Sequence, residues 1–194
     1  MINVLKLIID ISSWQEEVDW EQVANEFDGV ILKIGEGGHG LDEMFIDHVN
    51  NAVKYNIPYG IYYFSHAANI TDAYTEADEI DYFITDLLDG KEPELGIWYD
   101  CESDDMGEPT YTITSFIDYM RSKGYTNVGV YTSYNWLAYG RIDLSYMYDV
   151  PIWVAQYNSQ NDLAQEHPEL DIQGWQYTDN YSDEFPYDAS IFYK

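Results

Sequence analysis

Eight short apolar runs recur along the chain at regular intervals, and their spacing restricts the possible folds more than any other feature. They are rich in β-branched and aromatic residues, a composition that favours buried strands. The predicted strands cover residues 4–11, 29–34, 58–65, 95–102, 128–133, 152–157, 172–177 and 189–193. Because 194 residues is close to the size of one domain, we expect all of them to belong to a single domain over residues 1–194.

The segments between the first five runs carry apolar residues at helical spacing. The pattern is clearest in residues 70–88 and 113–120, and the second segment ends at Lys123-Gly124. Alternating strands and helices predict a parallel sheet with crossover helices. We therefore expect an α/β fold, a closed TIM-like barrel whose last three connections are shortened, with a doubly wound open sheet as the alternative. After Tyr134 the helical pattern weakens, so the final third should consist mainly of strands and loops.

The chain is strongly acidic, with 36 Asp and Glu residues against 8 Lys and Arg residues and a formal net charge of −28. Such a surface repels phosphate backbones and anionic lipids, so we expect no nucleic-acid partner and no membrane partner. No apolar run approaches the ~18 residues that span a bilayer. The first residues, Met1-Ile2-Asn3, lack the basic region and apolar core of a signal peptide, so none is expected in this chain. The single cysteine, Cys101, excludes an internal disulfide.

Carboxylates stand directly at the ends of several apolar runs. Asp10 follows Leu7-Ile8-Ile9 within the first run, Glu36 follows the second run, Asp100 and Glu102 close the fourth, and Asp188 opens the last. In a (β/α) barrel the catalytic groups gather at the carboxyl ends of the strands. The sequence therefore predicts an acidic site at that end of the barrel.

The triplet Asp100-Cys101-Glu102 is the most informative of these positions. Residues i and i+2 of a strand point to the same face, about 6.6 to 7 Å apart, so both carboxyls should enter one site while Cys101 packs on the other side. Two carboxyls so close cannot both ionise freely, and one should keep its proton near neutral pH. Glycoside hydrolysis needs such a pair of an acid and a carboxylate.

Other interpretations of these residues stay open at this point. In a chain with 36 acidic residues, an acidic pair at this spacing is also common on a solvated surface. The four carboxylates Asp10, Asp100, Glu102 and Asp188 also suit a hard divalent cation. A non-catalytic carbohydrate-binding barrel is a further alternative. Among the histidines, none is at ligand spacing from another, and His66 should line the rim of the cleft, so we predict neither a metal site nor a cofactor.

The order and spacing of motifs along almost the whole chain resemble those of the family 25 glycoside hydrolases. This family comprises the Chalaropsis-type lysozymes, or N-acetylmuramidases, of phage endolysins and bacterial autolysins. Two of these motifs contain the strand-end carboxylates and read Ile9-Asp10-Ile11-Ser12-Ser13-Trp14-Gln15 and Trp98-Tyr99-Asp100-Cys101-Glu102. The others lie at residues 18–20, 30–37, 60–64, 77–83, 130–132, 152–157 and 174–177, and at Asp188. The family's last motif usually has Asn two residues after the Asp, and here that position is Ser190.

The resemblance implies a (β/α)5(β)3 barrel that cleaves the β-1,4 bond between N-acetylmuramic acid and N-acetylglucosamine. By motif, Glu102 would be the general acid, Asp100 would orient or stabilise the reacting sugar, and Asp10 and Asp188 would support them. The reaction is open between assistance by the substrate's acetamido group, direct attack by Asp100, and inversion through water. Another β-glycosidase, such as a chitinase, is the alternative activity.

The resemblance also implies which residues contact the sugar and where the protein acts. The expected substrate-binding residues lie in family motifs toward strand ends: Tyr62, Tyr131, Trp153, Trp175, Glu36 and Lys33. For Lys33 we favour a structural ion pair with Asp10 or Glu36 over a contact with the muramyl carboxylate. We expect a monomer whose partner is the peptidoglycan glycan strand of the bacterial cell wall. Because its charge opposes anionic walls, a separate wall-binding module or protein would assist it.

Overall fold

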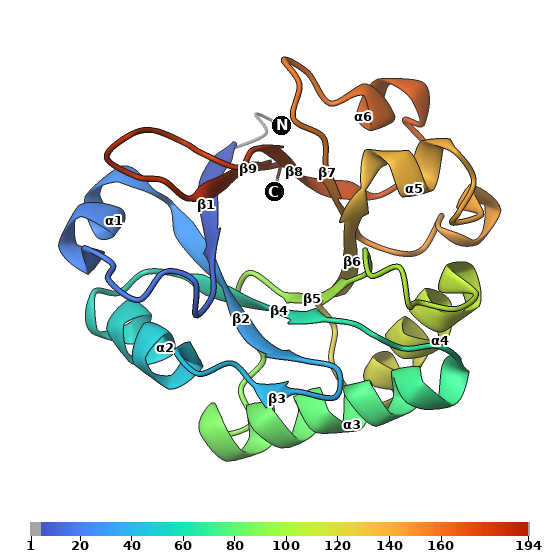
Figure 1. Ribbon diagram of the computed structural model, residues 1–194, viewed down its shortest axis with the longest axis horizontal. Coiled ribbons are helices and arrows are strands. Elements are labelled where there is room, and N and C mark those ends of the chain that lie inside the picture. Colours follow the sequence, from blue (N-terminus) through green and yellow to red (C-terminus); the bar gives the residue numbers. More distant parts are fainter. Residues whose placement is uncertain (1–4, 194) are drawn as a thin grey trace.

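The apolar runs form a closed barrel in the computed structural model, which describes residues 5–193 (Figure 1). The barrel strands in order around the ring are β1 (Lys6–Ile11), β2 (Gly29–Glu36), β4 (Tyr59–Phe64), β5 (Ile97–Asp100), β6 (Val128–Ser133), β7 (Ile152–Ala155), β8 (Ile172–Thr178) and β9 (Asp188–Phe192). Pairing of β1 with both β2 and β9 closes the ring, and β3 (Gly40–Leu41) adds a hairpin to β2. The prediction of a closed barrel is therefore confirmed, and the open sheet is excluded.

Helices follow the first five barrel strands and lie outside the ring (Figure 1). They are α1 (Trp20–Glu26), α2 (Phe45–Lys54), α3 (Ile70–Leu87), α4 (Pro109–Ser122) and the short α5 (Tyr134–Ala138). The final third also contains the 3-10 helix η1 (Leu144–Tyr146) and α6 (Asp162–Glu166) in a segment that we expected to be loop. The Asn161 side chain caps α6 by accepting a hydrogen bond from Ala164 N at 3.1 Å. Within residues 5–193, no helix is both long and apolar enough to span a membrane.

The last strand, β9, runs antiparallel to both of its neighbours, whereas the other seven barrel strands are parallel. The segment 179–187 that connects β8 to β9 is too short for a helical crossover, so the chain turns back directly. As a result Asp188, the first residue of β9, pairs with Asp10 near the end of β1. The reversed direction of β9 therefore places the Asp188 carboxylate at the same edge of the barrel as the carboxyl ends of the parallel strands. The first residue of the first predicted run, Val4, lies outside the described residues.

Side chains that point into the barrel form an apolar layer below a polar layer. Trp98 and Asp100 of β5 illustrate this, because alternation turns both inward with the tryptophan deeper. The apolar layer consists of Ile8, Ile31, Trp98, Tyr131, Trp153 and Phe192. Glycines make room for its rings, since a Cβ at Gly129 would lie 2.5 Å from Trp98 and one at Gly174 2.7 Å from Phe192. The strand residues between these positions pack outward against the helices, and Cys101 is among them as expected.

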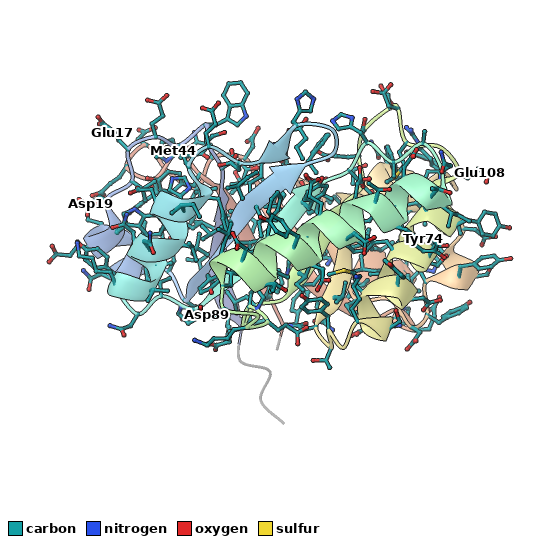
Figure 2. All side chains as sticks on the ribbon, turned by 90° about the horizontal axis from the view of Figure 1, so that it is seen from below. Glu17, Asp19, Met44, Tyr74, Asp89 and Glu108 are labelled. Carbon is teal, nitrogen blue, oxygen red and sulfur yellow. The ribbon has the colours of Figure 1, made fainter. Side chains whose placement is uncertain are left out.

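The polar layer opens at one edge of the barrel. Figure 2 places Glu17, Met44 and Glu108, which lie in or beside loops that follow strands, toward one edge of the molecule, and Asp89, which precedes β5, toward the other. The first edge is the carboxyl end of the parallel strands, where barrel enzymes carry their active sites.

Candidate active site

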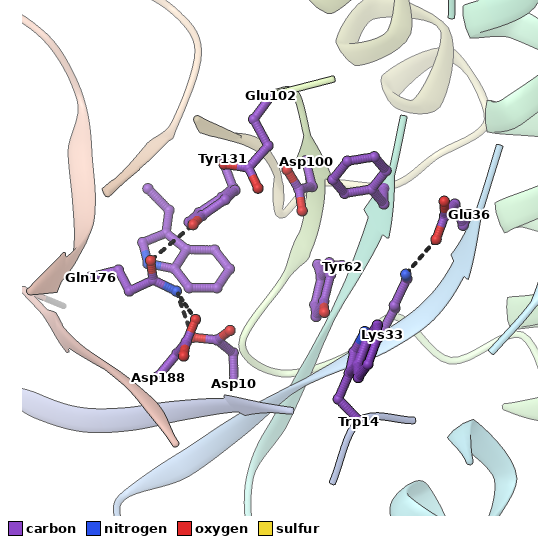
Figure 3. A pocket seen from close by; sticks show the side chains of 12 residues that line it. Asp10, Trp14, Lys33, Glu36, Tyr62, Asp100, Glu102, Tyr131, Gln176 and Asp188 are labelled. Carbon is purple, nitrogen blue, oxygen red and sulfur yellow. Dashed lines mark hydrogen bonds and ion pairs between the residues drawn. The ribbon is translucent and has the colours of Figure 1, made fainter. Parts of the chain in front are cut away.

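A pocket of about 310 Å³ lies at the carboxyl ends of the strands (Figure 3). Its walls combine carboxylates, aromatic rings and one lysine. The lining residues are Asp10, Trp14, Lys33, Glu36, Tyr62, Phe64, Asp100, Glu102, Tyr131, Trp153, Gln176 and Asp188. The structure thus brings together nine of the ten predicted site residues.

Asp100 and Glu102 point into this pocket together, although β5 ends at Asp100. The backbone stays extended beyond the strand because Cys101 N donates to Tyr131 O at 2.8 Å. Thr132 Oγ1 also donates to Cys101 O at 2.7 Å. The alternation of side chains therefore continues for two more residues, and the carboxyl groups share a face (Figure 3). The two carboxyls do not lie on a solvated surface edge.

The carboxyl of Asp100 is buried, and one of its oxygens has no hydrogen-bond partner. The residue is 4% exposed, and its Oδ1 is the only buried side-chain oxygen or nitrogen in residues 5–193 without a hydrogen-bond partner. Burial raises the pKa of Asp100 well above its usual value, and the negative charges of Glu102 and Asp10 raise it further. An unpaired polar atom at such a depth is costly, so Oδ1 is a ready hydrogen-bond acceptor for a bound ligand.

Glu102 stands at the mouth of the pocket and is more exposed than Asp100. Loss of solvation around its carboxyl raises the pKa of Glu102, and the charge of Asp188 adds to this effect. A carboxylic acid that keeps its proton and remains accessible is suited to protonating a leaving group.

Gln176 holds the other two carboxylates of the site in place. Its Nε2 donates to Asp10 Oδ2 and to Asp188 Oδ2, both at 3.1 Å. Its Oε1 accepts hydrogen bonds from the hydroxyls of Tyr131 at 2.8 Å and Tyr157 at 3.1 Å. The amide thereby links the acidic pair to Tyr131 (Figure 3) and to Tyr157, and both tyrosines line the hollow that also contains Glu102.

The pairing of β1 with β9 forces Asp10 and Asp188 together at this point. Burial raises the pKa of Asp10 well above its usual value, and the charge of Asp188 contributes. Burial, with a contribution from the charge of Asp179, raises the pKa of Asp188 to about 6. The pair therefore holds a proton at mildly acidic pH.

Replacing Asp188 with Asn should stabilise the protein at neutral pH. Because folding raises the pKa of Asp188 from 3.8 to about 6, the folded state binds more protons than the unfolded state in this range. The stability that the protonated form confers is present below about pH 4 and is lost as the pH rises through about 6. After discounting for partial exposure, we expect D188N to be about 1–2 kcal/mol more stable than wild type at about pH 7.5.

Urea denaturation of both proteins at about pH 4 and about pH 7.5 measures this difference. The two should be nearly equally stable at the lower pH. A D188N variant that is less stable than wild type at the higher pH would contradict the assignment.

Lys33 lies on β2 beside Glu36 and makes a salt bridge to it, with Nζ 2.6 Å from Oε2. This matches the structural role that we favoured for Lys33. Burial acts to raise the pKa of Glu36, but hydrogen bonds from Lys33 and His66 outweigh it and lower the pKa. Both side chains still line the pocket, at the side opposite Asp188 (Figure 3).

Trp153 and Trp175 were both expected to contact the sugar, but only Trp153 lines the pocket. Trp153 lies in the floor of the pocket, 1% exposed, and its Nε1 donates to Ser190 Oγ at 3.0 Å. Trp175 does not line the pocket, which corrects that expectation. It follows Gly174 and precedes Gln176, both of which face inward, so alternation turns its ring outward, where Nε1 donates to Gln156 O at 2.8 Å.

Sequence reasoning missed three residues of the pocket: Trp14, Phe64 and Gln176. Trp14 lies in a family motif after β1, and its ring is 87% exposed at the pocket's edge. Gln176 has the same inward parity as Gly174, so the alternation on β8 was a signal that favoured it over Trp175. Phe64 likewise shares the inward face of β4 with Tyr62.

A second hollow of about 550 Å³ continues the site past Glu102. It shares Glu102, Tyr131 and Asp188 with the first pocket and extends to Tyr134 and Tyr157. The two hollows together form a groove with Glu102 between its halves. Such a groove accommodates an extended ligand whose reacting bond lies at the acid.

No three of the strand-end carboxylates Asp10, Asp100, Glu102 and Asp188, all of them among the described residues, bring their ligand atoms within 4.8 Å of one another. Within residues 5–193, the group of three or more potential ligands whose donor atoms lie within 4.8 Å of one another is Glu36, His39 and His66. His39 and His66 therefore lie together in space, although their spacing in the sequence is not that of metal ligands. His66 does lie at the rim, with Nε2 2.9 Å from Glu36 Oε1.

Comparison with known proteins places this site in a family. The model of Glycosyl hydrolases family 25 matches residues 9–184. The modular autolysin LytC from Streptococcus pneumoniae is 30% identical with a TM-score of 0.81, over 97% of this chain and 47% of that chain. The chain thus spans about half the length of this autolysin. No match was found among curated proteins.

Two other solved structures share the fold at lower sequence identity. The spore cortex lytic enzyme SleM from Clostridium perfringens has a TM-score of 0.83 at 20% identity, over 97% of this chain and 67% of that chain. The catalytic domain of endolysin ply40 from bacteriophage P40 of Listeria monocytogenes has a TM-score of 0.77 at 23% identity, over 99% of this chain and 95% of that chain. From the family match across most of its length, together with the closed barrel, we conclude that the chain belongs to glycosyl hydrolase family 25.

Proposed function

We propose that this protein is a peptidoglycan hydrolase, a lysozyme that cleaves the β-1,4 bond between N-acetylmuramic acid and N-acetylglucosamine. The observation that carries the proposal is the pair of carboxyls in one groove, Asp100 buried with a free oxygen and Glu102 accessible at the mouth. Family membership supports glycoside hydrolysis, and the autolysin similarity favours a cell-wall substrate.

In the proposed first step, Glu102 donates its proton to the glycosidic oxygen as the bond from that oxygen to the anomeric carbon breaks. The substrate's own acetamido oxygen attacks the anomeric carbon, and Asp100 Oδ1 accepts a hydrogen bond from the acetamido N–H. Because Oδ1 has no partner in the protein, it is available for this contact. The leaving sugar departs with a free hydroxyl, and a cyclic oxazolinium ion remains on the enzyme.

In the second step, the Glu102 carboxylate takes a proton from water, and the water oxygen attacks the anomeric carbon. The ring opens, the acetamido group is restored, and the product keeps its anomeric configuration. Direct attack by Asp100 on the anomeric carbon is the alternative retaining route, and a substrate without the acetamido carbonyl distinguishes the two.

The rest of the groove suits a glycan strand. Tyr62 and Trp14 offer ring faces on one side of Glu102, and Tyr134 and Tyr157 line the other side. Asp188, which Gln176 holds beside Asp10, adds negative charge near Glu102 and favours its protonated form. In this proposal, Lys33 holds Glu36 in place.

Products of digestion test the proposal directly. Purified peptidoglycan and chitin are treated separately with the protein, and the fragments are reduced and identified by mass spectrometry. We expect fragments with N-acetylmuramic acid at the reducing end and no comparable cleavage of chitin. Reducing ends of N-acetylglucosamine, or preferred cleavage of chitin, would support another β-glycosidase. Binding of the glycan without any cleavage would identify a carbohydrate-binding barrel.

The proposed setting is the bacterial cell wall, where the protein acts as a monomer on glycan strands. Its net charge of −28 opposes approach to walls that carry anionic polymers. A separate wall-binding module or protein is the partner that overcomes this repulsion. The span of about half the autolysin's length is consistent with a catalytic unit that works beside other modules.

A further inference from the structure

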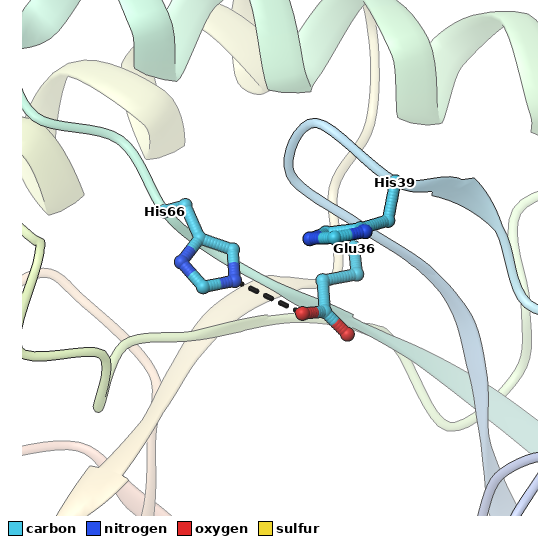
Figure 4. Close-up of side chains that lie close together, drawn as sticks. All are labelled: Glu36, His39 and His66. Carbon is cyan, nitrogen blue, oxygen red and sulfur yellow. Dashed lines mark hydrogen bonds and ion pairs between the residues drawn. The ribbon is translucent and has the colours of Figure 1, made fainter.

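A second cluster of functional side chains lies at the rim of the groove and takes no part in the proposed reaction. Glu36 ends β2, His39 lies in the turn between β2 and β3, and His66 follows β4 (Figure 4). Their potential ligand atoms all lie within 4.8 Å of one another. Two imidazoles and a carboxylate are the donor set of many zinc sites with an open position.

The spacing of these groups suits a tetrahedral ion. Two donors bound to zinc at ~2.0–2.1 Å lie about 3.3 Å apart. His66 Nε2 is already 2.9 Å from Glu36 Oε1, and the rings of His39 and His66 have centroids 6.0 Å apart. We infer that side-chain rotations of the exposed His39 and the half-buried Glu36 and His66 bring the three donors around one ion.

The backbone that carries the three ligands is fixed. Gly37 N donates to Phe64 O at 2.9 Å, which ties the turn after Glu36 to the segment before His66. Glu76 Oε1 accepts a hydrogen bond from His66 N at 3.0 Å. The packing is so close that a Cβ at Gly37 would lie 2.2 Å from Glu76 Oε1. The site is therefore organised before any ion binds.

The neighbouring groups leave Nε2 of His66 and Oε1 of Glu36 facing each other. Ser103 Oγ lies 3.2 Å from His66 Nδ1 and Asp105 Oδ2 lies 3.7 Å from it, so Nδ1–H has acceptors while Nε2 faces Glu36. Such outer partners orient metal-bound imidazoles. Lys33 occupies Oε2 of Glu36 at 2.6 Å, which leaves Oε1 available.

We propose that Glu36, His39 and His66 bind one Zn²⁺ ion at the rim of the groove. Imidazole ligands favour zinc and its neighbours over Ca²⁺ and Mg²⁺, which prefer oxygen donors. The ion takes the place of the hydrogen bond between His66 and Glu36, and its fourth position is open to water. Because Glu36 also lines the main pocket, the bound ion adds positive charge at the edge of an otherwise acidic groove. The proposal does not depend on the reaction at Glu102.

Calorimetric titration of the chelator-treated, dialysed protein with ZnCl₂ near pH 7.5 tests the site. We expect one ion per chain, no comparable binding of CaCl₂ or MgCl₂, and a rise in Tm on addition of zinc. Replacing either His39 or His66 with Ala should weaken binding at least about tenfold and abolish the rise in Tm. His39 is exposed, so H39A should fold normally, and circular dichroism verifies this for both variants.

His167→Ala is the matched control, because His167 Nδ1 lies 3.1 Å from Glu169 Oε1 but no third ligand completes the group. H167A should bind zinc as wild type does. Cobalt provides an independent measurement, since tetrahedral Co²⁺ bound to wild type should give visible absorption that H39A lacks. Zinc binding that H39A and H66A leave unchanged, or no binding to wild type, would overturn the proposal.

Discussion

Replacing Glu102 with Gln should lower kcat on peptidoglycan by about 10³-fold or more while leaving the fold intact. Gln keeps the size and polarity of the side chain but has no proton to give to the glycosidic oxygen. Glu102 stands at the mouth of the groove, beside Asp188, in surroundings that favour its protonated form. Turbidity loss of a wall suspension and release of reducing ends both measure the effect.

Glu17→Gln is a suitable control for this change. Glu17 is exposed and lies on the same edge of the molecule, in the loop after β1, outside the pocket that holds Glu102 (Figure 2). E17Q should retain wild-type activity. The Tm of E102Q should equal or exceed that of wild type, because the substitution removes a charge that burial disfavours. If E102Q kept more than about a tenth of the activity, the role of general acid would belong to another residue.

Replacing Asp100 with Asn should lower kcat by about 10²–10³-fold, with a smaller effect on KM. Asn cannot offer a full negative charge to the acetamido nitrogen as positive charge develops there. The loss should fall mainly on kcat, because this interaction strengthens in the transition state. Steady-state kinetics with a soluble peptidoglycan fragment separates the two constants.

A second substrate shows whether Asp100 acts through the acetamido group. Wild type and D100N are compared on a fragment that has lost the acetyl group of the reacting sugar. Both proteins should be slow on it, and the difference between them should shrink, because Asp100 has no amide to orient. An unchanged ratio, or equally fast cleavage of this fragment by wild type, would contradict the assisted mechanism. Retention or inversion, followed by NMR at early times, separates the route through water.

Asp104→Asn is the matched control for this residue. Asp104 lies two residues beyond Glu102 but at the surface, where its Oδ1 pairs with Arg141 at 3.2 Å. Exposed pairs of this kind contribute little to stability. D104N should therefore behave like wild type on both substrates.

The barrel and its acidic centre follow from sequence patterns of short range. Alternation within β5 fixes that Trp98 and Asp100 face inward and that Tyr99 and Cys101 face the helices. The same two-residue period carries Glu102 to the groove, although hydrogen bonds of the neighbouring strand rather than β5 itself hold that extended backbone. Predictions that depend only on this period are therefore sound.

Contacts between segments that are distant in the sequence are harder to predict from the alternation of residues along a strand. Trp175 sits in a suggestive motif, yet its parity on β8 turns it outward, and Gln176 takes the inward place. His39 and His66 lie far apart in sequence and meet because β2 and β4 are neighbours with the pairing Glu36 to Phe64 at their ends. Their approach depends on strand register and on the absence of a side chain at Gly37, which histidine spacing does not reveal.

The stacked layers inside the barrel have a consequence for how such enzymes diversify. Trp98 packs edge to face on both Trp153 and Phe192 beneath the groove, and the ring centroids of Trp98 and Trp153 are 5.8 Å apart. Two residues further along β1, β2 and β5, the next inward positions are Asp10, Lys33 and Asp100, which line the groove. A substitution in the polar layer can therefore change substrate preference while the apolar layer continues to stabilise the fold. New specificities can then arise without a change in the barrel itself.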